Sequence, residues 1–247
     1  MIILKSPKEI DIMAANGAIL KECFAFALDF IEPGRTREQL NEKIEKIILS
    51  HGARPAFKGF QGFPAATCVS VNEEVVHGIP GAQAFEEGDI VGLDIGVVKD
   101  SYYADAARTI PVGTISKEAA RLLEVTQDAL DEGISQARPG KRLTDISHAV
   151  EQRATKAGYS VVRSLVGHGI GQQMHEEPQV PNFGPPSQGP ELKDGLVLAI
   201  EPMVNIGGSD VFTLEDGWTI ITADRSMSAH FEDTVAITKE GPRILTR

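Results

Sequence analysis

The sequence predicts an α+β protein built from two related halves, each with a pair of helices followed by extended strands. Three observations carry this prediction. Two capped amphipathic helices open each half, segments of period-two alternation follow each helix pair, and turn residues recur at a fixed offset. The offset is 106 residues both from Pro33 to Pro139 and from Gly52 to Gly158. We expect a single domain over 1–247 that arose by internal duplication, with halves of about 1–113 and 114–247.

The first two helices are predicted by their start signals and their apolar spacing. SPKE at residues 6–9 offers a serine cap, a proline at the first helical position and a glutamate that can close a capping box. Apolar residues at helical spacing follow until Pro33. TREQ at residues 36–39 is a second capping box, and the helix it opens stops near Gly52.

The second half repeats this plan. Ser116 is expected to cap a helix that stops at Pro139, and Thr144 is expected to cap another that stops at Gly158. Four later segments change to period two and to β-branched residues, which is typical of strands. These segments are TCVSVN (67–72), DIVGLDIGVV (89–98), LVLAI (196–200) and DTVAIT (233–238).

Composition excludes several classes of protein. The net charge of -11, with no basic run, argues against binding to DNA or to an anionic membrane. No apolar run reaches the roughly 18 residues of a membrane span, and the N-terminus lacks the apolar core of a signal peptide. Cys23 and Cys68 show no metal-type spacing and no disulfide framework. We therefore expect a cytoplasmic protein.

Two aspartates occupy positions where the strand pattern predicts burial. Asp94 lies among apolar neighbours, and an unpaired carboxylate there is costly to desolvate unless it binds a metal. Asp105 follows eleven residues later, a distance that suits a hairpin returning the chain to Asp94. Simpler interpretations stay open at this point: a salt bridge from Asp105 to Arg108, and a place for Asp94 at the end of its strand.

Acidic residues occur at matching places in the second half. Glu201 ends one apolar run, and Glu232 opens another, with Asp233 expected to face solvent on the opposite side of that strand. Each glutamate alone could be an edge residue, but a cluster of like charges needs a cation. His168 lies between glycines, which we expect to let the backbone approach a metal.

These residues predict an oxygen-rich metal site. Four carboxylates and one imidazole suit Mn, Fe or Co better than they suit a metal that prefers thiolates. With so many oxygens, two ions about 3.5–4 Å apart can be bridged, and such a pair activates water for hydrolysis.

The residues also resemble a known family, the type I methionine aminopeptidases. The resemblance runs from about Lys5 to Leu245 and rests on five segments in order: NEEVVHGIP, DIVGLDIGVVKDSYYADAART, GHGIGQQMHEEPQV, AIEPMV and DGWTIITADRSMSAHFEDTVAIT. It implies the pita-bread (creatinase/aminopeptidase) fold, in which two pseudo-symmetric halves curve an antiparallel sheet around a dinuclear metal site, with helices outside.

The resemblance implies a ligand set for two divalent ions, with Co, Mn or Fe(II) expected and Zn as an alternative. The ligands would be Asp94, Asp105, His168, Glu201 and Glu232, the same five residues that the preceding analysis of the sequence singles out. Asp105 and Glu232 would bridge the two ions. A metal-bridging water or hydroxide would attack the first peptide bond, and Glu201 would shuttle its proton.

Two more histidines, His77 and His175, match the family's catalytic, substrate-contacting histidines that do not bind metal. A donor beside the scissile carbonyl stabilises the oxyanion, and losing one such donor typically costs ~10²-fold to 10³-fold in rate. The simpler interpretations are a loop residue for His77 and a surface residue for His175.

The resemblance further implies an apolar pocket for the methionine side chain, an environment that suits a polarizable thioether. By position it would involve Phe57, Phe63, Cys68, Met174 and Trp218, although plain core packing would also explain the aromatic residues.

Four positions depart from the family pattern. Phe60 and Phe63 stand where tyrosine is frequent, Gln61 replaces a frequent histidine, and Gly96 stands where a threonine often follows the first aspartate. These changes leave the ligands intact but bear on the pocket's shape and the surroundings of the metals.

From the resemblance we expect removal of the initiator methionine from nascent proteins and peptides when the second residue is small. The alternatives are a proline dipeptidase-like hydrolase with the same ligands, and a non-catalytic pita-bread binding protein. Expected partners are nascent N-termini and, weakly and transiently, the ribosome. We expect a monomer that contacts neither DNA nor a membrane.

Overall fold

The computed structural model describes all residues, 1–247, as four α-helices, one 3-10 turn and fifteen strands. The helices are α1 (Pro7–Phe30), α2 (Arg37–Ser50), α3 (Lys117–Gln136) and α4 (Leu143–Lys156), and the 3-10 turn is η1 (Phe60–Gly62). The strands are β1 (Arg54–Pro55), β2 (Cys68–Val71), β3 (Glu74–Val76), β4 (Ile90–Lys99), β5 (Tyr102–Pro111), β6 (Ser160–Val161), β7 (Gly167–Gly169), β8 (Glu176–Val180), β9 (Val197–Ile200), β10 (Met203–Asn205), β11 (Val211–Thr213), β12 (Ile220–Thr222), β13 (Ser228–His230), β14 (Glu232–Thr238) and β15 (Gly241–Ile244).

Three of the four predicted helix starts are confirmed. In α1, the Ser6 hydroxyl accepts from the Glu9 amide, and the Glu9 carboxylate accepts from the Ser6 amide at 2.7 Å. Thr36 and Gln39 form the same reciprocal box at α2. Ser116 caps α3 alone. These caps satisfy amide groups that a helix leaves without partners in its first turn.

The predicted start of the fourth helix is wrong by two residues. The cap is Arg142, whose amide donates to the Asp145 carboxylate at 2.9 Å. The Thr144 hydroxyl is engaged elsewhere, because it accepts a hydrogen bond from the amide of Gln188 at 2.8 Å. A contact with a distant loop therefore overrides the local capping signal.

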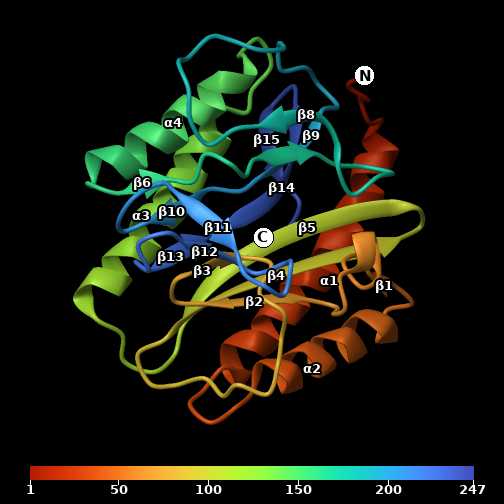
Figure 1. The fold of residues 1–247 in the computed structure, drawn as a ribbon. Coiled ribbons are helices and arrows are strands. Elements are labelled where there is room, and N and C mark those ends of the chain that lie inside the picture. Colours follow the sequence, from red (N-terminus) through yellow and green to blue (C-terminus); the bar gives the residue numbers. More distant parts are fainter.

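One antiparallel sheet of nine strands organises the molecule (Figure 1). Its strand order is β1-β4-β5-β14-β9-β7-β8, with β2 also paired to β4 and β15 to β14. All four predicted strands are present, as β2, β4, β9 and β14. Residues 1–113 and 114–247 join where β5 meets β14, so the last strand of the first segment lies beside a strand from near the C-terminus in the middle of the sheet.

β4 and β5 form the predicted hairpin. Asp100 and Ser101 make the turn with φ of 51° and 66°, the left-handed conformation that two-residue hairpin turns of type I′ require. The register sets Asp105 opposite Gly96, two residues from Asp94. The expected return of Asp105 toward Asp94 is confirmed.

The helices pack in two groups, visible in Figure 1 as α1 with α2 and α3 with α4. The first group buries odd-numbered residues of β4, such as Leu93 and Ile95, together with Leu20 and Ile44 of the helices. The second group covers β9 and β14 through a separate core. None of the helices combines the length and apolar composition needed to span a bilayer.

Candidate metal centre and active site

Five neighbouring strands of the sheet each bring one predicted ligand to the same region. In sheet order these are β4, β5, β14, β9 and β7, and the residues they carry are Asp94, Asp105, Glu232, Glu201 (directly after β9) and His168. The order of the ligands along the chain differs from their order across the sheet, because β14 inserts between β5 and β9.

Strand alternation points the ligands away from the helices. On β4 and β14 the helix-facing core uses odd-numbered residues, including Leu93 and Val235, so Asp94 and Glu232 face the opposite side. Asp105 on β5 lies between two alanines of the helix-facing core and so faces the same side as Asp94. The helices therefore bury one face of the sheet and leave a polar site on the other.

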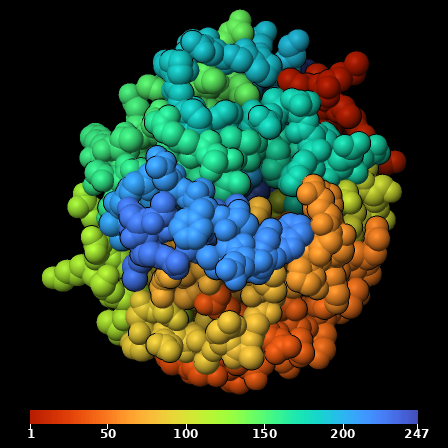
Figure 2. All heavy atoms as spheres, in the orientation of Figure 1, coloured from red at the N-terminus to blue at the C-terminus, as the bar shows by residue number.

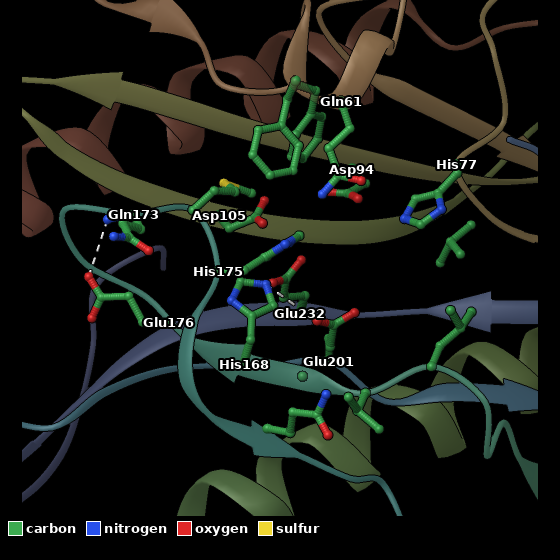
Figure 3. A pocket seen from close by; sticks show the side chains of 18 of the residues that line it. Gln61, His77, Asp94, Asp105, His168, Gln173, His175, Glu176, Glu201 and Glu232 are labelled. Atoms are coloured by element: carbon green, nitrogen blue, oxygen red, sulfur yellow. Dashed lines mark hydrogen bonds and ion pairs between the residues drawn. The ribbon is translucent and has the colours of Figure 1, made fainter. Parts of the chain in front are cut away.

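Three of these side chains form a compact group. Asp105, His168 and Glu232 have ligand atoms that all lie within 4.8 Å of one another. The carboxyl groups of Asp94 and Asp105 lie close enough to affect each other's pKa, and Glu201 Oε1 lies 3.7 Å from His168 Nε2. Figure 3 shows all five side chains pointing into a common space. The structure thus brings together every residue of the predicted ligand set.

The oxygens of this group fit a divalent cation. Asp94 Oδ1, Asp105 Oδ1 and Glu232 Oε1 are buried and have no hydrogen-bond partner. Burial raises the pKa of Asp94 to about 7 and that of Glu201 to about 8. Burial and the neighbouring carboxylates raise the pKa of Asp105 and Glu232 well above their ordinary values. Such crowded, desolvated carboxylates ionise together only with a cation between them.

His168 is set up as a neutral nitrogen ligand. Its Nδ1 lies 2.9 Å from the Gly169 carbonyl oxygen, which fixes the proton on Nδ1 and leaves Nε2 free toward Glu201. Burial lowers the pKa of His168 to about 4, so the imidazole is uncharged at neutral pH.

The glycines beside His168 serve the sheet rather than the metals, which corrects the expectation from sequence. A Cβ at Gly167 would lie 2.5 Å from the Ala199 carbonyl oxygen, and one at Gly169 would lie 2.3 Å from that of Glu177. Both glycines are therefore needed for β7 to pass between its two neighbours.

Asp233 does not face solvent, and Arg108 does not pair with Asp105. Asp233 is fully buried and accepts from Arg108 Nη2 at 2.6 Å, Arg247 Nε at 2.5 Å and the Thr246 hydroxyl at 2.7 Å. The sequence interpretation fails because the C-terminal residues and β5 cover this side of β14. Arg108 lies on the helix-facing side of β5, away from the site.

The ligands lie in a cavity of about 790 Å³ that also contains the other predicted site residues. Figure 2 shows the surface hollowed where segments from the first and second halves meet. His77 and His175 both line this cavity. A loop role for His77 and a surface role for His175 are thus incomplete descriptions.

The two histidines differ in how they are held. His77 has a φ of 59°, a left-handed conformation that is uncommon for a residue other than glycine and is often found at functional sites. Burial lowers the pKa of His77 to about 4, so it is neutral. The His175 ring is exposed, with its centroid 4.3 Å from that of His168 in an edge-to-face arrangement.

The predicted side-chain pocket is a single apolar cluster at one end of the cavity. Phe57, Phe63, Cys68 and Met174 are buried together, and the Trp218 ring packs against Phe63 at 5.2 Å between centroids. All five line the cavity. They are therefore not merely core residues.

Besides Phe63, the other three departures from the family pattern lie in or beside this cavity. A Cβ at Gly96 would lie 2.7 Å from Phe57 Cε1 and 2.9 Å from Ala56 Cβ, so glycine lets the Phe57 ring lie against β4. The Phe60 ring meets the His175 ring edge-on at 5.4 Å. Gln61, with a φ of 49°, lines the same cavity.

Sequence reasoning left His230 without a role. This residue is 3% exposed, and its unpartnered Nε2 lies 3.6 Å from Glu201 Oε2. The Thr109 hydroxyl fixes its backbone on both sides, at 2.8 Å and 3.0 Å. His230 lies two residues before Glu232, a spacing that places both side chains on the same face of an extended chain. This spacing is the signal in the sequence that would have indicated its place in the site.

Comparison with known proteins agrees with this geometry. The sequence matches metallopeptidase family M24 over residues 11–239. It is 51% identical over 246 residues to a methionine aminopeptidase from Clostridium perfringens, covering 100% of this chain and 99% of that protein.

Solved structures give the same result for the fold. The structure superposes on a methionine aminopeptidase from Thermotoga maritima with a TM-score of 0.98 and 44% identity, covering 100% of both chains. It also superposes on a prolidase from Pyrococcus horikoshii with a TM-score of 0.81 and 26% identity, covering 99% of this chain and 63% of that one. These matches confirm the pita-bread fold and the resemblance to methionine aminopeptidases. The chain belongs to metallopeptidase family M24.

Proposed function

We propose that this chain is a methionine aminopeptidase that removes the initiator methionine from nascent proteins and peptides. The observation that carries the proposal is that two features share one cavity: a five-residue ligand set with unpartnered carboxylate oxygens, and an adjacent apolar pocket whose polarizable lining suits a thioether. The name of the full-length relative at 51% identity supports it.

Two divalent ions would be held by Asp94, Asp105, His168, Glu201 and Glu232. When bound, such a pair supplies Lewis acidity and an activated water for hydrolysis. The oxygen-rich donors suit Co, Mn or Fe(II), with Zn as an alternative.

The chain's own side chains would bind the substrate and move the proton. By the resemblance, Glu201 would accept a proton from the attacking water and return it to the leaving amine. Neutral His77 and His175 would donate hydrogen bonds to the scissile carbonyl and its oxyanion. Phe57, Phe63, Cys68, Met174 and Trp218 would exclude water from the methionine side chain.

The finer features of the proposal come from the resemblance and from composition. A small second residue in the substrate follows from the resemblance. With a net charge of -11, contact with the ribosome would be weak, transient and salt-sensitive, and the enzyme would act as a cytoplasmic monomer.

A second candidate is proline dipeptidase activity, which the shared fold with a prolidase favours. The apolar cluster beside the ligands favours a methionine substrate instead, because its apolar and polarizable lining suits a thioether side chain. A non-catalytic binding role is disfavoured, because the ligand set is intact and its oxygens have no protein partner.

The test measures hydrolysis of Met-Ala-Ser and of Ala-Pro with Co(II), Mn(II) or Fe(II), each with and without chelator. Release of methionine that the chelator abolishes and the metal restores is the expected result. Selective cleavage of Ala-Pro would replace this proposal with the second candidate. Absence of turnover with every metal would indicate the binding protein.

A further inference from the structure

The beginning of the chain contacts the loop that carries two of the proposed substrate-binding residues. This loop, Gly171–His175, connects β7 to β8 and is called the 171–175 loop below. Lys5 Nζ lies 2.5 Å from Glu176 Oε2, directly after the loop, and the two side chains are only 2% and 4% exposed. The other oxygen of Glu176 accepts from the Gln173 amide at 3.2 Å (Figure 3). One carboxylate thus joins Lys5 to the loop backbone.

A second route connects the start of α1 to the same loop. Glu9, which closes the α1 capping box with Ser6, also accepts a hydrogen bond from the Tyr102 hydroxyl at 2.5 Å. That hydroxyl in turn accepts from Gln172 Nε2 at 3.1 Å. Hydrogen bonds from Ser6 and Tyr102 hold the pKa of Glu9 at about 2, so this acceptor is charged throughout the working pH range.

The packing around Lys5 shows that its ion pair is built into the fold. The Lys5 amide donates to the Gly195 carbonyl at 2.6 Å, and its ammonium donates to the Ile3 carbonyl at 3.0 Å. A Cβ at Gly171 would lie 2.3 Å from Lys5 Cε and 2.6 Å from Glu176 Oε1. Desolvating both charges is unfavourable unless their geometry is tightly satisfied.

The segment held in this way is part of the substrate cavity. Ile3, whose carbonyl Lys5 binds, lines the same cavity as Met174 and His175. Met174 belongs to the apolar cluster, and His175 is exposed to the cavity beside His168. The segment before α1 therefore lies at the same cavity as Met174 and His175.

We propose that Lys5 and Tyr102 are positioning residues that clamp the 171–175 loop, so that His175 and Met174 are set for the polypeptide substrate. The inference rests on the proposed aminopeptidase function. A donor that is displaced by about 1 Å can cost ~10²-fold in rate. Loss of the clamp should therefore reduce turnover without removing any group that contacts the substrate.

The test compares Lys5→Met and Tyr102→Phe with Lys8→Met, an exposed lysine near the start of the same helix that makes no ion pair. In metal-loaded enzyme, Lys5→Met should lower kcat/KM for Met-Ala-Ser by about 10- to 100-fold, and Tyr102→Phe by less. Amide hydrogen exchange in the 171–175 loop should be faster in both variants than in the wild type. The same difference should be seen when the metal has been removed from all three proteins by chelator. Lys8→Met should match the wild type in every measurement.

A double variant separates positioning from stability. Lys5→Met alone leaves the Glu176 charge buried, whereas Lys5→Met with Glu176→Gln removes both charges and keeps an acceptor for Gln173. We expect the double variant to recover the melting temperature while kcat/KM stays low. Recovery of both quantities would overturn the proposal.

Two further outcomes also decide the matter. Wild-type kcat/KM and wild-type loop exchange in both Lys5→Met and Tyr102→Phe would overturn the clamp. If Lys5→Met fails to fold, Tyr102→Phe and the double variant still decide. The variant His175→Ala distinguishes failure of the clamp from failure of the proposed function. Full activity in that variant would show that His175 has no catalytic role, whether or not Lys5 and Tyr102 hold the loop.

Discussion

Glu232 and Asp233 are consecutive residues of β14, and both are buried, at 2% and 0% exposure. Their surroundings have opposite charge. Asp233 faces the helix side of the sheet, where it meets Arg108, Arg247 and the hydroxyl of Thr246. Glu232 faces the cavity, where its neighbours are other carboxylates and one of its oxygens has no partner.

The difference separates a structural carboxylate from a candidate metal ligand. A buried carboxylate beside two guanidinium groups is already neutralised by the protein. One that faces further carboxylates is unfavourable until a cation is added. Both residues are buried carboxylates, so neither burial nor charge distinguishes them. The groups that surround each carboxylate do.

The largest effect on activity is expected from Asp105→Asn, on the cavity side of the sheet that Glu232 also faces. The substitution keeps the shape but removes the charge of a proposed bridging ligand, so turnover of Met-Ala-Ser should be abolished while the protein stays folded. Steady-state rates, circular dichroism and metal content after dialysis check this. A variant that kept most of the activity would rule out the two-metal assignment.

Asp233→Asn should show the reverse pattern. Removing this charge leaves Arg108 and Arg247 without their shared partner, and breaking a buried pair costs about 3 kcal/mol. Urea unfolding of the metal-loaded protein should show that loss, with kcat unchanged for the folded fraction. If Asp233→Asn were as stable as the wild type but inactive, Asp233 would belong to the active site and would not differ in role from Glu232.

The two sides should also differ in how pH acts on the metal-free protein. Folding raises the pKa of Asp94 to about 7 and that of Glu201 to about 8. A raised pKa stabilises the fold fully below the unfolded value and loses this contribution as pH rises through the folded value. Burial lowers the pKa of His77 and His168 to about 4, and this acts in the opposite direction up to about pH 6.5. The melting temperature of chelated protein should therefore fall between about pH 6.5 and pH 8.

Added Mn(II) should reverse that decline, since the ion replaces the lost protons. Glu201→Gln should flatten the profile, and Asp233→Asn should leave its slope unchanged. A melting temperature that rose over the same interval would contradict the assignment of raised pKa values to the cavity side.

The smallest effect is expected from Arg247→Met. Arg247 is 32% exposed, so its bond to Asp233 is partly screened by solvent, and Arg108 remains as a partner. We expect a loss of about 1 kcal/mol in the free energy of unfolding and unchanged kcat. A loss as large as that of Asp233→Asn would show that Arg247 alone neutralises the carboxylate.

The sequence predicted the elements whose signals are local. The capping boxes at Ser6 and Thr36, the β4–β5 hairpin and the acidic residues at strand positions all follow from short-range patterns. The gathering of the five ligands could be anticipated because they stand out against apolar strands and because the family resemblance orders them.

What the sequence could not show depends on partners far away in the chain. Asp233 is buried by Arg108, which lies 125 residues away, and Lys5 pairs with Glu176 across 171 residues. The glycines beside His168 are required by neighbouring strands rather than by any local turn. Such requirements arise only from the order and register of the sheet.

The insertion of β14 between β5 and β9 has a consequence for synthesis of the chain. Asp94 and Asp105 leave the ribosome long before Glu232, by roughly ten seconds at ordinary rates of translation. His168 and Glu201 are made during that interval, but β5 and β9 cannot be joined in one sheet until β14 has been made. The middle strand of the sheet is nearly the last to be made, so the chain gains its metal affinity and its protease chemistry together, after both halves have emerged.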